Sequence, residues 1–257
     1  MNTFQNILVE TNENTATITI NRPPVNILNI DTMLEVTAAI EDLNRQKALK
    51  SIIITGAGEK AFSAGVDVQD HTRKWMTRMI ESFDGMLKNV ITCDKPVLAA
   101  INGLALGGGM ELVLACDLAV AVETARLGQP EIKLGVFAGY ANAVLPQLIA
   151  RKKAMEILLM GETISAAEAQ SIGLINWVVS ANELAATVEE LTKKLNELSA
   201  VALKWCKRSI YAGLLKDLDE NVAVVDKIYL DDLMSTVDAN EGIKAFSEKR
   251  RPVWQNA

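Results

Sequence analysis

Cysteine and histidine are scarce in this sequence, which has three cysteines and one histidine among 257 residues. Cys93, Cys116 and Cys206 are widely spaced, form no CxxC pair and have no histidine near them in the sequence. This pattern lacks the ligand spacing of a zinc site, and an odd number of thiols does not suit a disulfide framework. We therefore expect three buried thiols in a reducing compartment and no metal.

Long apolar runs and strong net charge are also missing. No run reaches the roughly 20 apolar residues of a membrane-spanning helix, and residues 1–6 lack the basic start and apolar core of a signal peptide. Lysine and arginine number 26 against 32 acidic residues, and no basic cluster is combined with aromatic residues. These absences predict a cytoplasmic protein whose partners are neither membranes nor nucleic acids.

The residues that are present suit a single large domain, or one domain with an appendage, because 49% of them are hydrophobic and single cores stop growing at roughly 250 to 300 residues. The first half alternates short β-branched runs with longer amphipathic segments, which is typical of an α/β fold. Strands are expected at 7–10, 15–21, 51–55, 96–102 and 118–122. Helices are expected at 31–44 with Asp31 as N-cap, at 70–89 and at 107–116, and a loop at 56–67.

From about residue 139 the pattern becomes helical. Only 174–179 looks extended, and helices are expected at 141–149, 153–160, 166–172, 183–198, 201–215, 220–234 and 241–248. A helical end of this size either packs back on the sheet core or docks on a second subunit. Both possibilities remain open from the sequence.

Three glycines, Gly107 to Gly109, follow a predicted strand and open a predicted helix. Glycines at such a turn let backbone N–H groups approach a ligand closely, and the helix dipole favours negative charge there. The spacing matches neither GxGxxG nor GxxxxGK[ST], so a dinucleotide or phosphate loop is not supported. The turn therefore suits an anion or developing oxyanion, or else only a tight contact between strand and helix.

Two glutamates lie beside glycine-containing turns. Glu111 falls in the first turn of the helix after Gly109, and Glu131 ends the sequence Gly128-Gln129-Pro130-Glu131. Each alone could be a helix-start residue or a solvated loop acid. If both face one apolar pocket, each raises the proton affinity of the other, so that one can act as acid and its partner as base.

His71, the single histidine, follows another glycine-supported loop. Without a serine or cysteine in a nucleophile setting, a helix-start or surface histidine is favoured over a catalytic one. Trp75, Met76, Met79 and Met86 recur at about helical spacing, which indicates core packing or the wall of an apolar pocket.

Three segments together resemble the crotonase superfamily, specifically its enoyl-CoA hydratases and isomerases. They are AFSAGVDV at 61–68, KPVLAAINGLALGGGMEL at 95–112 and GQPE at 128–131, and the likeness extends from residue 21 to residue 250. The resemblance implies an α/β fold, a crotonase-like spiral of ββα units. Residues 1–198 would form this core with an acyl-CoA site, and residues 199–257 a helical region that assembles trimers, often paired into hexamers.

The same resemblance implies the chemistry. The backbone N–H groups of Val66 and Gly108 would form the oxyanion hole for the thioester oxygen of an acyl-CoA substrate. Glu111 would deprotonate the water that adds to the β-carbon, and Glu131 would exchange a proton with the α-carbon. No cofactor beyond the CoA moiety of the substrate is implied. The residues implied in CoA binding are Val25, Ala64, Val66, Asp67, Val68, Gln69 and Gly108.

The sequence departs from the superfamily pattern at 135–143, where GVFAGYANA replaces a Gly-Gly-Thr stretch, and at Gln69, which replaces a lysine. The segment 23–28 is also one residue shorter than the common form. Together with Asp70-His71 and Val136-Phe137, these departures resemble cyclohexa-1,5-diene-1-carbonyl-CoA hydratases of anaerobic aromatic degradation. His71, Phe137, Gly139 and Tyr140 are then candidates for an acyl pocket, although Phe137 and Tyr140 could also be ordinary packing.

Two carboxyl groups favour a hydro-lyase over an isomerase, because one carboxylate suffices for an allylic double-bond shift. An isomerase, a decarboxylase or a dehalogenase of the same fold remains the alternative among enzymes, within fatty acid metabolism or aromatic degradation. A different class is an RNA-binding or non-catalytic relative, which the acidic composition disfavours. A structural oligomer with a vestigial pocket is a third alternative.

Overall fold

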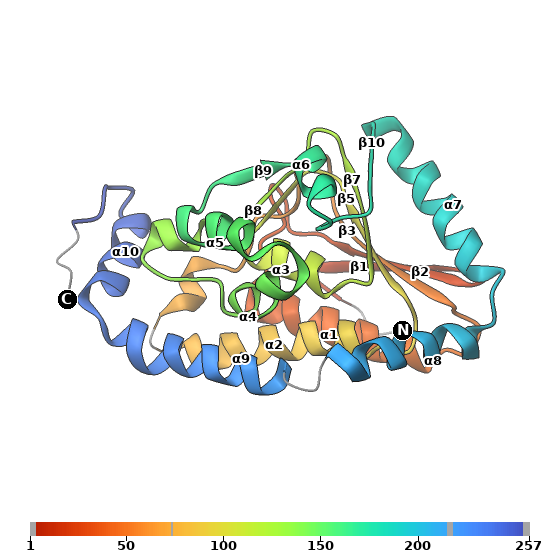
Figure 1. Cartoon of the computed structure of the whole chain (residues 1–257), viewed down its shortest axis with the longest axis horizontal. Helices are drawn as coiled ribbons and strands as arrows, with labels where there is room; N and C mark the ends of the chain where they lie inside the picture. Colours follow the sequence, from red (N-terminus) through yellow and green to blue (C-terminus); the bar gives the residue numbers. More distant parts are fainter. Residues whose placement is uncertain (1–3, 73, 215–217, 254–257) are drawn as a thin grey trace.

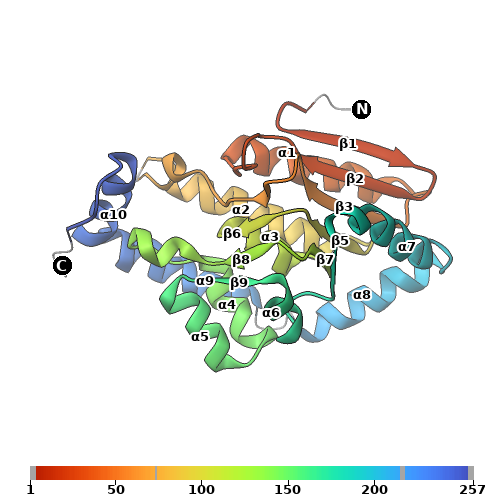
Figure 2. The same cartoon turned by 90° about the horizontal axis from the view of Figure 1, so that it is seen from above.

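The computed structural model describes residues 4–72, 74–214 and 218–253. Residue 215, expected to end a helix, and residues 254–257 of the predicted C-terminal region lie outside the described residues. Within the described part, no helix is long and apolar enough to cross a bilayer. Figure 1 and Figure 2 show strands that run through the middle of the molecule, with helices on both sides.

The larger sheet has six strands in the order β1-β2-β3-β5-β7-β10. The first two form an antiparallel hairpin, and every other neighbouring pair is parallel. The strands are β1 (Ile7–Asn12), β2 (Thr15–Ile20), β3 (Ser51–Gly56), β5 (Val97–Ile101), β7 (Leu118–Val122) and β10 (Trp177–Val179).

A second sheet of four strands lies in segments where the sequence predicts no strand, one of them in the predicted loop at 56–67. Its order is β4-β6-β8-β9, from β4 (Ala61–Ser63), β6 (Leu104–Leu106), β8 (Arg126–Gly128) and β9 (Thr163–Ser165). Each consecutive pair β3–β4, β5–β6 and β7–β8 gives one strand to each sheet. This repetition is the ββα arrangement that the resemblance implies, and the predicted α/β fold is confirmed.

Alternate residues of the central strands face opposite sides of the larger sheet, as the two-residue repeat of a strand requires. Ile53, Leu98 and Val120 form a small core with Val188 of α7 (Leu184–Asn196). The intervening residues join the main core with α1 (Ile30–Arg45) and α2 (Met76–Thr92). Burial on both faces explains why these strands read as continuous apolar runs.

Two helix starts differ from the predicted ones. Asn29, not Asp31, caps α1, because its side chain accepts a hydrogen bond from the Thr32 N–H. Helix α2 begins at Met76, and residues 68–71 form instead a short 3₁₀ helix, in which the Asp67 side chain accepts a hydrogen bond from the Gln69 N–H. The loop that carries Val66 therefore continues further toward α2 than expected.

The remaining α-helices lie after residue 107. They are α3 (Gly108–Ala115), α4 (Gly139–Leu148), α5 (Arg151–Met160), α6 (Ala166–Ser171), α8 (Ala200–Leu214), α9 (Leu218–Lys227) and α10 (Val237–Ser247), with a π-helical turn at Ile228–Asp232. Helix α9 packs against α4, and α10 against the 3₁₀ helix Pro130–Leu134. In Figure 1, α8 and α9 lie along the lower edge, on the same side as α2 and α4.

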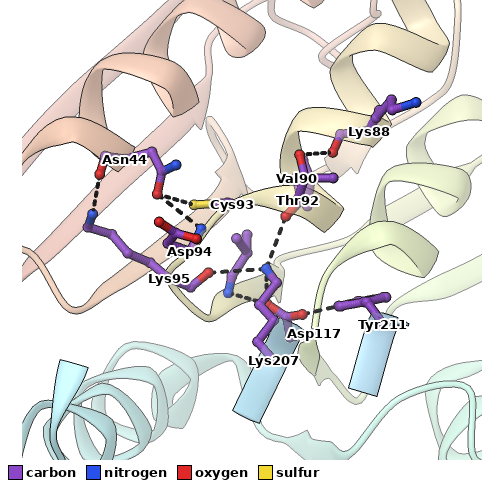
Figure 3. Close-up of polar contacts among 11 residues, drawn as sticks. Asn44, Lys88, Val90, Thr92, Cys93, Asp94, Lys95, Asp117, Lys207 and Tyr211 are labelled. Atoms are coloured by element: carbon purple, nitrogen blue, oxygen red, sulfur yellow. Dashed lines mark hydrogen bonds and ion pairs between the residues drawn. The ribbon is translucent and has the colours of Figure 1, made fainter. Parts of the chain in front are cut away.

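Helix α8 is fixed to the core by a buried ion pair. The Lys207 Nζ lies 2.7 Å from Asp117 Oδ2 and also donates to the carbonyl oxygens of Val90 and Lys95. The Tyr211 hydroxyl donates to the other oxygen of Asp117, as Figure 3 shows. Of the two arrangements left open by the sequence, the described C-terminal helices thus pack back on their own core. The division at residue 198 stays a prediction.

The cysteines are all free, and two of the three are less buried than the sequence predicts. Cys93 is buried and Cys116 half-buried, whereas Cys206 is exposed on α8. Helix α8 turns Lys207 and Tyr211 toward Asp117, and this orientation leaves Cys206 on the outer side.

Candidate active site

The turn between β6 and α3 requires glycine at two positions. Gly107 has a φ of 53°, a conformation that is costly for other residues. A Cβ on Gly109 would lie 2.3 Å from the carbonyl oxygen of Ser63, so that only glycine lets α3 pack so closely on β4. These constraints fix the start of α3, and with it the position of Glu111 in its first turn.

Glu111 is a buried carboxyl, with 4% of its surface exposed. Its Oε1 accepts a hydrogen bond of 2.8 Å from the Ala141 N–H in the first turn of α4. Burial, followed by the charge of Glu131, raises the pKa of Glu111 to about 8. The group can therefore hold or release a proton near neutral pH.

Glu131 reaches the same place from the 3₁₀ helix Pro130–Leu134. Its Oε1 lies against Gly107, where a Cβ would come within 2.3 Å of it. Within the described part of the chain, the buried Oε2 has no hydrogen-bond partner, and burial raises the pKa of Glu131 to about 7. An unpartnered carboxyl oxygen is costly unless a ligand uses it.

Two backbone N–H groups near these carboxyl groups take no part in the hydrogen bonds of the neighbouring β-bridge and helix. The isolated parallel bridge of Val66 with Leu28 uses the carbonyl of Gly65 and the N–H of Asp67, which leaves the Val66 N–H outside it. Gly108 is the first residue of α3, where an N–H has no partner within the helix. A Cβ on Gly108 would touch the Val66 side chain at 2.7 Å, so the two residues are neighbours.

Glu111, Glu131 and Val66 line one cavity of about 760 Å³, and Gly108 follows directly after Gly107 of the lining. Most of the residues singled out from the sequence line it: Ala64, Val66, Asp67, Val68, Gln69, His71, Glu111, Glu131, Phe137, Gly139 and Tyr140. Helix α10 closes part of it with Ile243 and Phe246. Among the described residues, no group of three or more His, Cys, Asp or Glu side chains is arranged to hold a metal ion.

A model of the enoyl-CoA hydratase/isomerase family matches residues 10–257. The chain belongs to this family. It is 38% identical over 249 residues to the putative enoyl-CoA hydratase/isomerase YngF of Bacillus subtilis, covering 95% of both chains. It is 36% identical to the short-chain-enoyl-CoA hydratase of Clostridium acetobutylicum, covering 96% of this chain and 97% of that one. The crystal structure of carnitinyl-CoA hydratase from Mycobacterium avium superposes with a TM-score of 0.89 at 34% identity, over 99% of this chain and 100% of that one.

The resemblance to the crotonase superfamily is thereby confirmed. Two residues implied in CoA binding do not reach the cavity surface in the described chain. Val25 instead accepts the Ala64 N–H through its carbonyl oxygen, and Ile27 takes the lining position. Gly108 is buried behind Gly107, which itself lines the cavity. The roles of Val25 and Gly108 stay predictions.

His71 ends the 3₁₀ helix that follows the Val66 loop and is half-buried in the cavity wall. Its Nδ1 lies 3.0 Å from the carbonyl oxygen of Asp67. Burial lowers the pKa of His71, which favours the neutral ring. The position therefore differs from that of a free surface histidine and suits a wall residue.

The sequence reasoning missed a second acid pair in this cavity. Asp84 of α2 and Asp226 of α9 both line it, and Asp226 Oδ1 would be 3.5 Å from a Cβ on Gly139. Burial, then the charge of Asp226, raises the pKa of Asp84 to about 8. No short motif marks either residue, because they lie on helices that meet only in the folded chain.

Proposed function

We propose that this protein adds water to the α,β double bond of an enoyl-CoA thioester and is thus a hydro-lyase. The observation that carries the proposal is the convergence of Glu111 and Glu131 on one cavity beside the Val66 and Gly108 amides. Relatives whose printed names are short-chain-enoyl-CoA hydratase and crotonyl-CoA hydratase support it. Two carboxyl groups with pKa values near neutrality suit a reaction that needs one acid and one base.

In the proposed reaction, the Glu111 carboxylate takes a proton from water as the water oxygen bonds to the β-carbon. The electron pair of the double bond moves through the α-carbon onto the thioester oxygen, where the Val66 and Gly108 N–H groups stabilise the enolate. Protonated Glu131 then gives its proton to the α-carbon. A proton passes from Glu111 back to Glu131, directly or through solvent, and this restores the starting state.

The CoA moiety is proposed to lie along residues 64–69, of which Ala64, Asp67, Val68 and Gln69 line the cavity. Lys133 and Lys249 also line it and can supply positive charge to phosphate groups. Lys133 is already paired with Glu162 at 2.8 Å. Lys249 therefore offers the more available cation.

We further propose a compact acyl group, with cyclohexa-1,5-diene-1-carbonyl-CoA of aromatic degradation as the cyclic candidate. Phe137, Tyr140 and Tyr229 line the cavity, and the rings of Phe137 and Tyr229 meet edge to face with centroids 5.1 Å apart. Flat apolar walls of this kind pack well against a ring. A ring substrate also agrees with the bulky segment at 135–143.

The test is a panel of unsaturated thioesters incubated with purified protein and followed by mass spectrometry. We expect the mass of one water to be added to crotonyl-CoA and to the cyclic dienoyl-CoA. Turnover of crotonyl-CoA alone would contradict the proposed cyclic substrate and would still support the proposed hydratase activity. Binding of all thioesters without any hydration would contradict the function itself.

The pH dependence of kcat/KM should be bell-shaped. The two raised pKa values, about 7 for Glu131 and about 8 for Glu111, belong to an interacting pair that holds one proton between them. Their order places this proton more often on Glu111, so the reactive form, with Glu131 protonated and Glu111 ionised, is the less populated of the two singly protonated forms. Below this window both groups are protonated and no base remains, and above it both are ionised and no acid remains. We expect kcat/KM for crotonyl-CoA to peak between pH 7 and 8 and to fall about tenfold per pH unit well outside it. A flat profile from pH 6 to 9 would show that the pair does not act as acid and base.

We propose a homotrimer or a pair of trimers in the cytoplasm. Large apolar side chains are exposed on α5 and α8, including Leu159 (62%), Val201 (66%) and Trp205 (59%). Such groups gather at oligomer interfaces. Sedimentation of the purified protein distinguishes a trimer, a hexamer and a monomer.

A further inference from the structure

A second hollow of about 460 Å³ lies between α4, α8 and the end of α3. Most of its lining is apolar, with Leu114, Val144, Leu148, Leu203 and Ile210 as members. The proposed hydration uses none of these residues. Its size and apolar lining suit a hydrocarbon chain.

Tyr140 lines both this hollow and the catalytic cavity, and it is the only described residue common to the two linings. Only 6% of its surface is exposed. Burial, then Glu111 and Cys116, raise the pKa of Tyr140. Glu111 lines the catalytic cavity and Cys116 the second hollow, and Tyr140, which lines both, lies at the boundary between the two spaces.

Tyr140, the partition between the two spaces, lies close to the reacting groups. Ala141, the residue after Tyr140, donates its N–H to the Glu111 Oε1 at 2.8 Å. Tyr140 is thus held in the first turn of the helix that positions Glu111. An acyl chain that extends past the β-carbon on this side meets the tyrosine before it can reach the second hollow.

The far wall of the hollow is fixed rather than loosely placed. Lys207 and Tyr211 of α8 line it, and both are bonded to Asp117, at 2.7 and 3.1 Å. Figure 3 shows these contacts together with those of Lys207 to the carbonyl oxygens of Val90 in α2 and of Lys95 in the loop after it. The hollow behind Tyr140 therefore has a wall on α8 whose position is fixed by the fold.

We propose that Tyr140 is the residue that limits acyl length, and that the hollow between α4 and α8 takes the distal methylenes of a longer acyl chain when its ring is removed. This inference rests on the proposed function, because it assumes that the acyl group lies beside Glu111. With the ring in place, the enzyme is restricted to short or compact cyclic acyl groups. Each methylene moved from water into an apolar site strengthens binding about fourfold.

The experiment compares kcat/KM for trans-2-enoyl-CoA thioesters of four, eight and twelve carbons in the wild type and in Tyr140→Ala. We expect the ratio of the twelve-carbon to the four-carbon value to rise at least tenfold in the variant. An unchanged ratio in a folded variant would overturn the inference. Tyr140→Leu, which keeps more of the core packing, gives the same comparison with a smaller rise if Tyr140→Ala does not fold.

Three further variants test whether the gain for the twelve-carbon thioester comes from opening the hollow behind Tyr140. Tyr140→Phe keeps the ring and should keep the wild-type length profile. Adding Leu203→Trp to Tyr140→Ala refills the hollow from α8, where Leu203 lines the hollow but not the catalytic cavity, and should remove the gain. Phe137→Ala enlarges the catalytic cavity without opening the partition and should give no comparable twelve-carbon gain. A gain in Phe137→Ala equal to that of Tyr140→Ala would contradict the assignment.

Binding of saturated thioesters separates this inference from the proposed function. Calorimetry with butanoyl-CoA and dodecanoyl-CoA needs no turnover, and Tyr140→Ala should favour dodecanoyl-CoA at least tenfold more than the wild type does. If the wild type hydrates no thioester but this binding shift occurs, the proposed hydratase function is contradicted and the role of Tyr140 as the partition is supported. If the wild type is active and Tyr140→Ala changes neither the kcat/KM ratio nor the binding ratio, only the role of Tyr140 is contradicted.

Discussion

Glu111→Gln is expected to lower kcat for hydration about 100- to 10,000-fold, the range for removal of a general acid or base. The glutamine oxygen can still accept the Ala141 N–H that Glu111 Oε1 accepts at 2.8 Å, so the fold should persist. What is lost is the base that takes the proton from water. Stopped assays of crotonyl-CoA hydration with purified variant and wild type give the ratio.

Glu131→Gln is expected to cause a loss of the same order, because a glutamine cannot give a proton to the α-carbon. The pair of variants separates two reactions of the family. An isomerase that relies on Glu131 alone would keep most of its double-bond shift in Glu111→Gln, whereas a hydratase loses nearly all water addition. Glu123→Gln, an exposed residue outside the cavity, is the matched control and should stay within twofold of wild type.

Stability gives Glu111→Gln a second readout. Burial raises the pKa of Glu111 in the folded protein from 4.5 to about 8, so the folded state binds its proton more tightly than the unfolded chain. The stability from this group is complete below pH 4.5 and is lost as the pH rises toward 8. Each unit of raised pKa is worth about 1.4 kcal/mol, so the glutamine variant should unfold at a higher temperature than wild type at pH 9. Equal melting temperatures at pH 9 would show that Glu111 ionises there without cost.

The parts of this site that could be predicted are those whose geometry is local in the sequence. Gly107 must adopt a positive φ, so the turn before Glu111 has a glycine signature. The sequence Gly128-Gln129-Pro130-Glu131 likewise leads from a short strand into a 3₁₀ helix. Short-range constraints of this kind leave marks that a single sequence reveals.

The second sheet was missed for a physical reason. Each of its strands β4, β6, β8 and β9 has only three residues, too few to show a two-residue repeat. Their pairing is set by neighbours far along the chain, as when the Gly107 N–H bonds the Gly128 carbonyl. The predicted loop at 56–67 was therefore partly wrong. The start of α2 was misplaced because Asp67 caps a separate 3₁₀ turn.

Long-range contacts also explain the residues that sequence reasoning did not find. Asp84 and Asp226 meet only because α9 folds back across the cavity. Lys207 lies in a helix with two other basic residues, Lys204 and Arg208, and its sequence context is typical of a solvated charge. Only 6% of its side chain is exposed, however. Nothing in the sequence links it to Asp117, which stands 90 residues earlier. Their pairing makes a strong prediction for stability.

Lys207→Met is expected to destabilise the protein by about 3 to 5 kcal/mol, the usual cost of removing one partner of a buried ion pair. The methionine fills similar space but leaves the Asp117 carboxyl without its cation, and the Val90 and Lys95 carbonyl oxygens without the Nζ donor. For a chain of this size the melting temperature should fall by on the order of 10 °C. Thermal unfolding followed by circular dichroism measures the change.

Lys204→Met is the matched control, because Lys204 lies one turn earlier on α8 and pairs with Asp94 nearer the surface, with 32% of its side chain exposed. Exposed pairs contribute about 0 to 1 kcal/mol, so this variant should stay close to wild type. Asp117→Asn in the Lys207→Met background should recover part of the loss, since it removes the uncompensated charge while its amide oxygen can still accept the Val97 N–H that Asp117 accepts.

The loss in Lys207→Met should also depend on pH. Burial already raises the pKa of Asp117 above 3.8 with Lys207 beside it, and removal of the cation raises it further. A raised folded-state pKa means that stability falls as the pH rises through it. The variant should therefore lie nearer to wild-type stability at acidic pH, where the Asp117 carboxyl is protonated, and fall further below it as the pH rises and this carboxyl ionises. Equal losses for Lys204→Met and Lys207→Met at every pH would show that burial of this pair does not hold α8 in place.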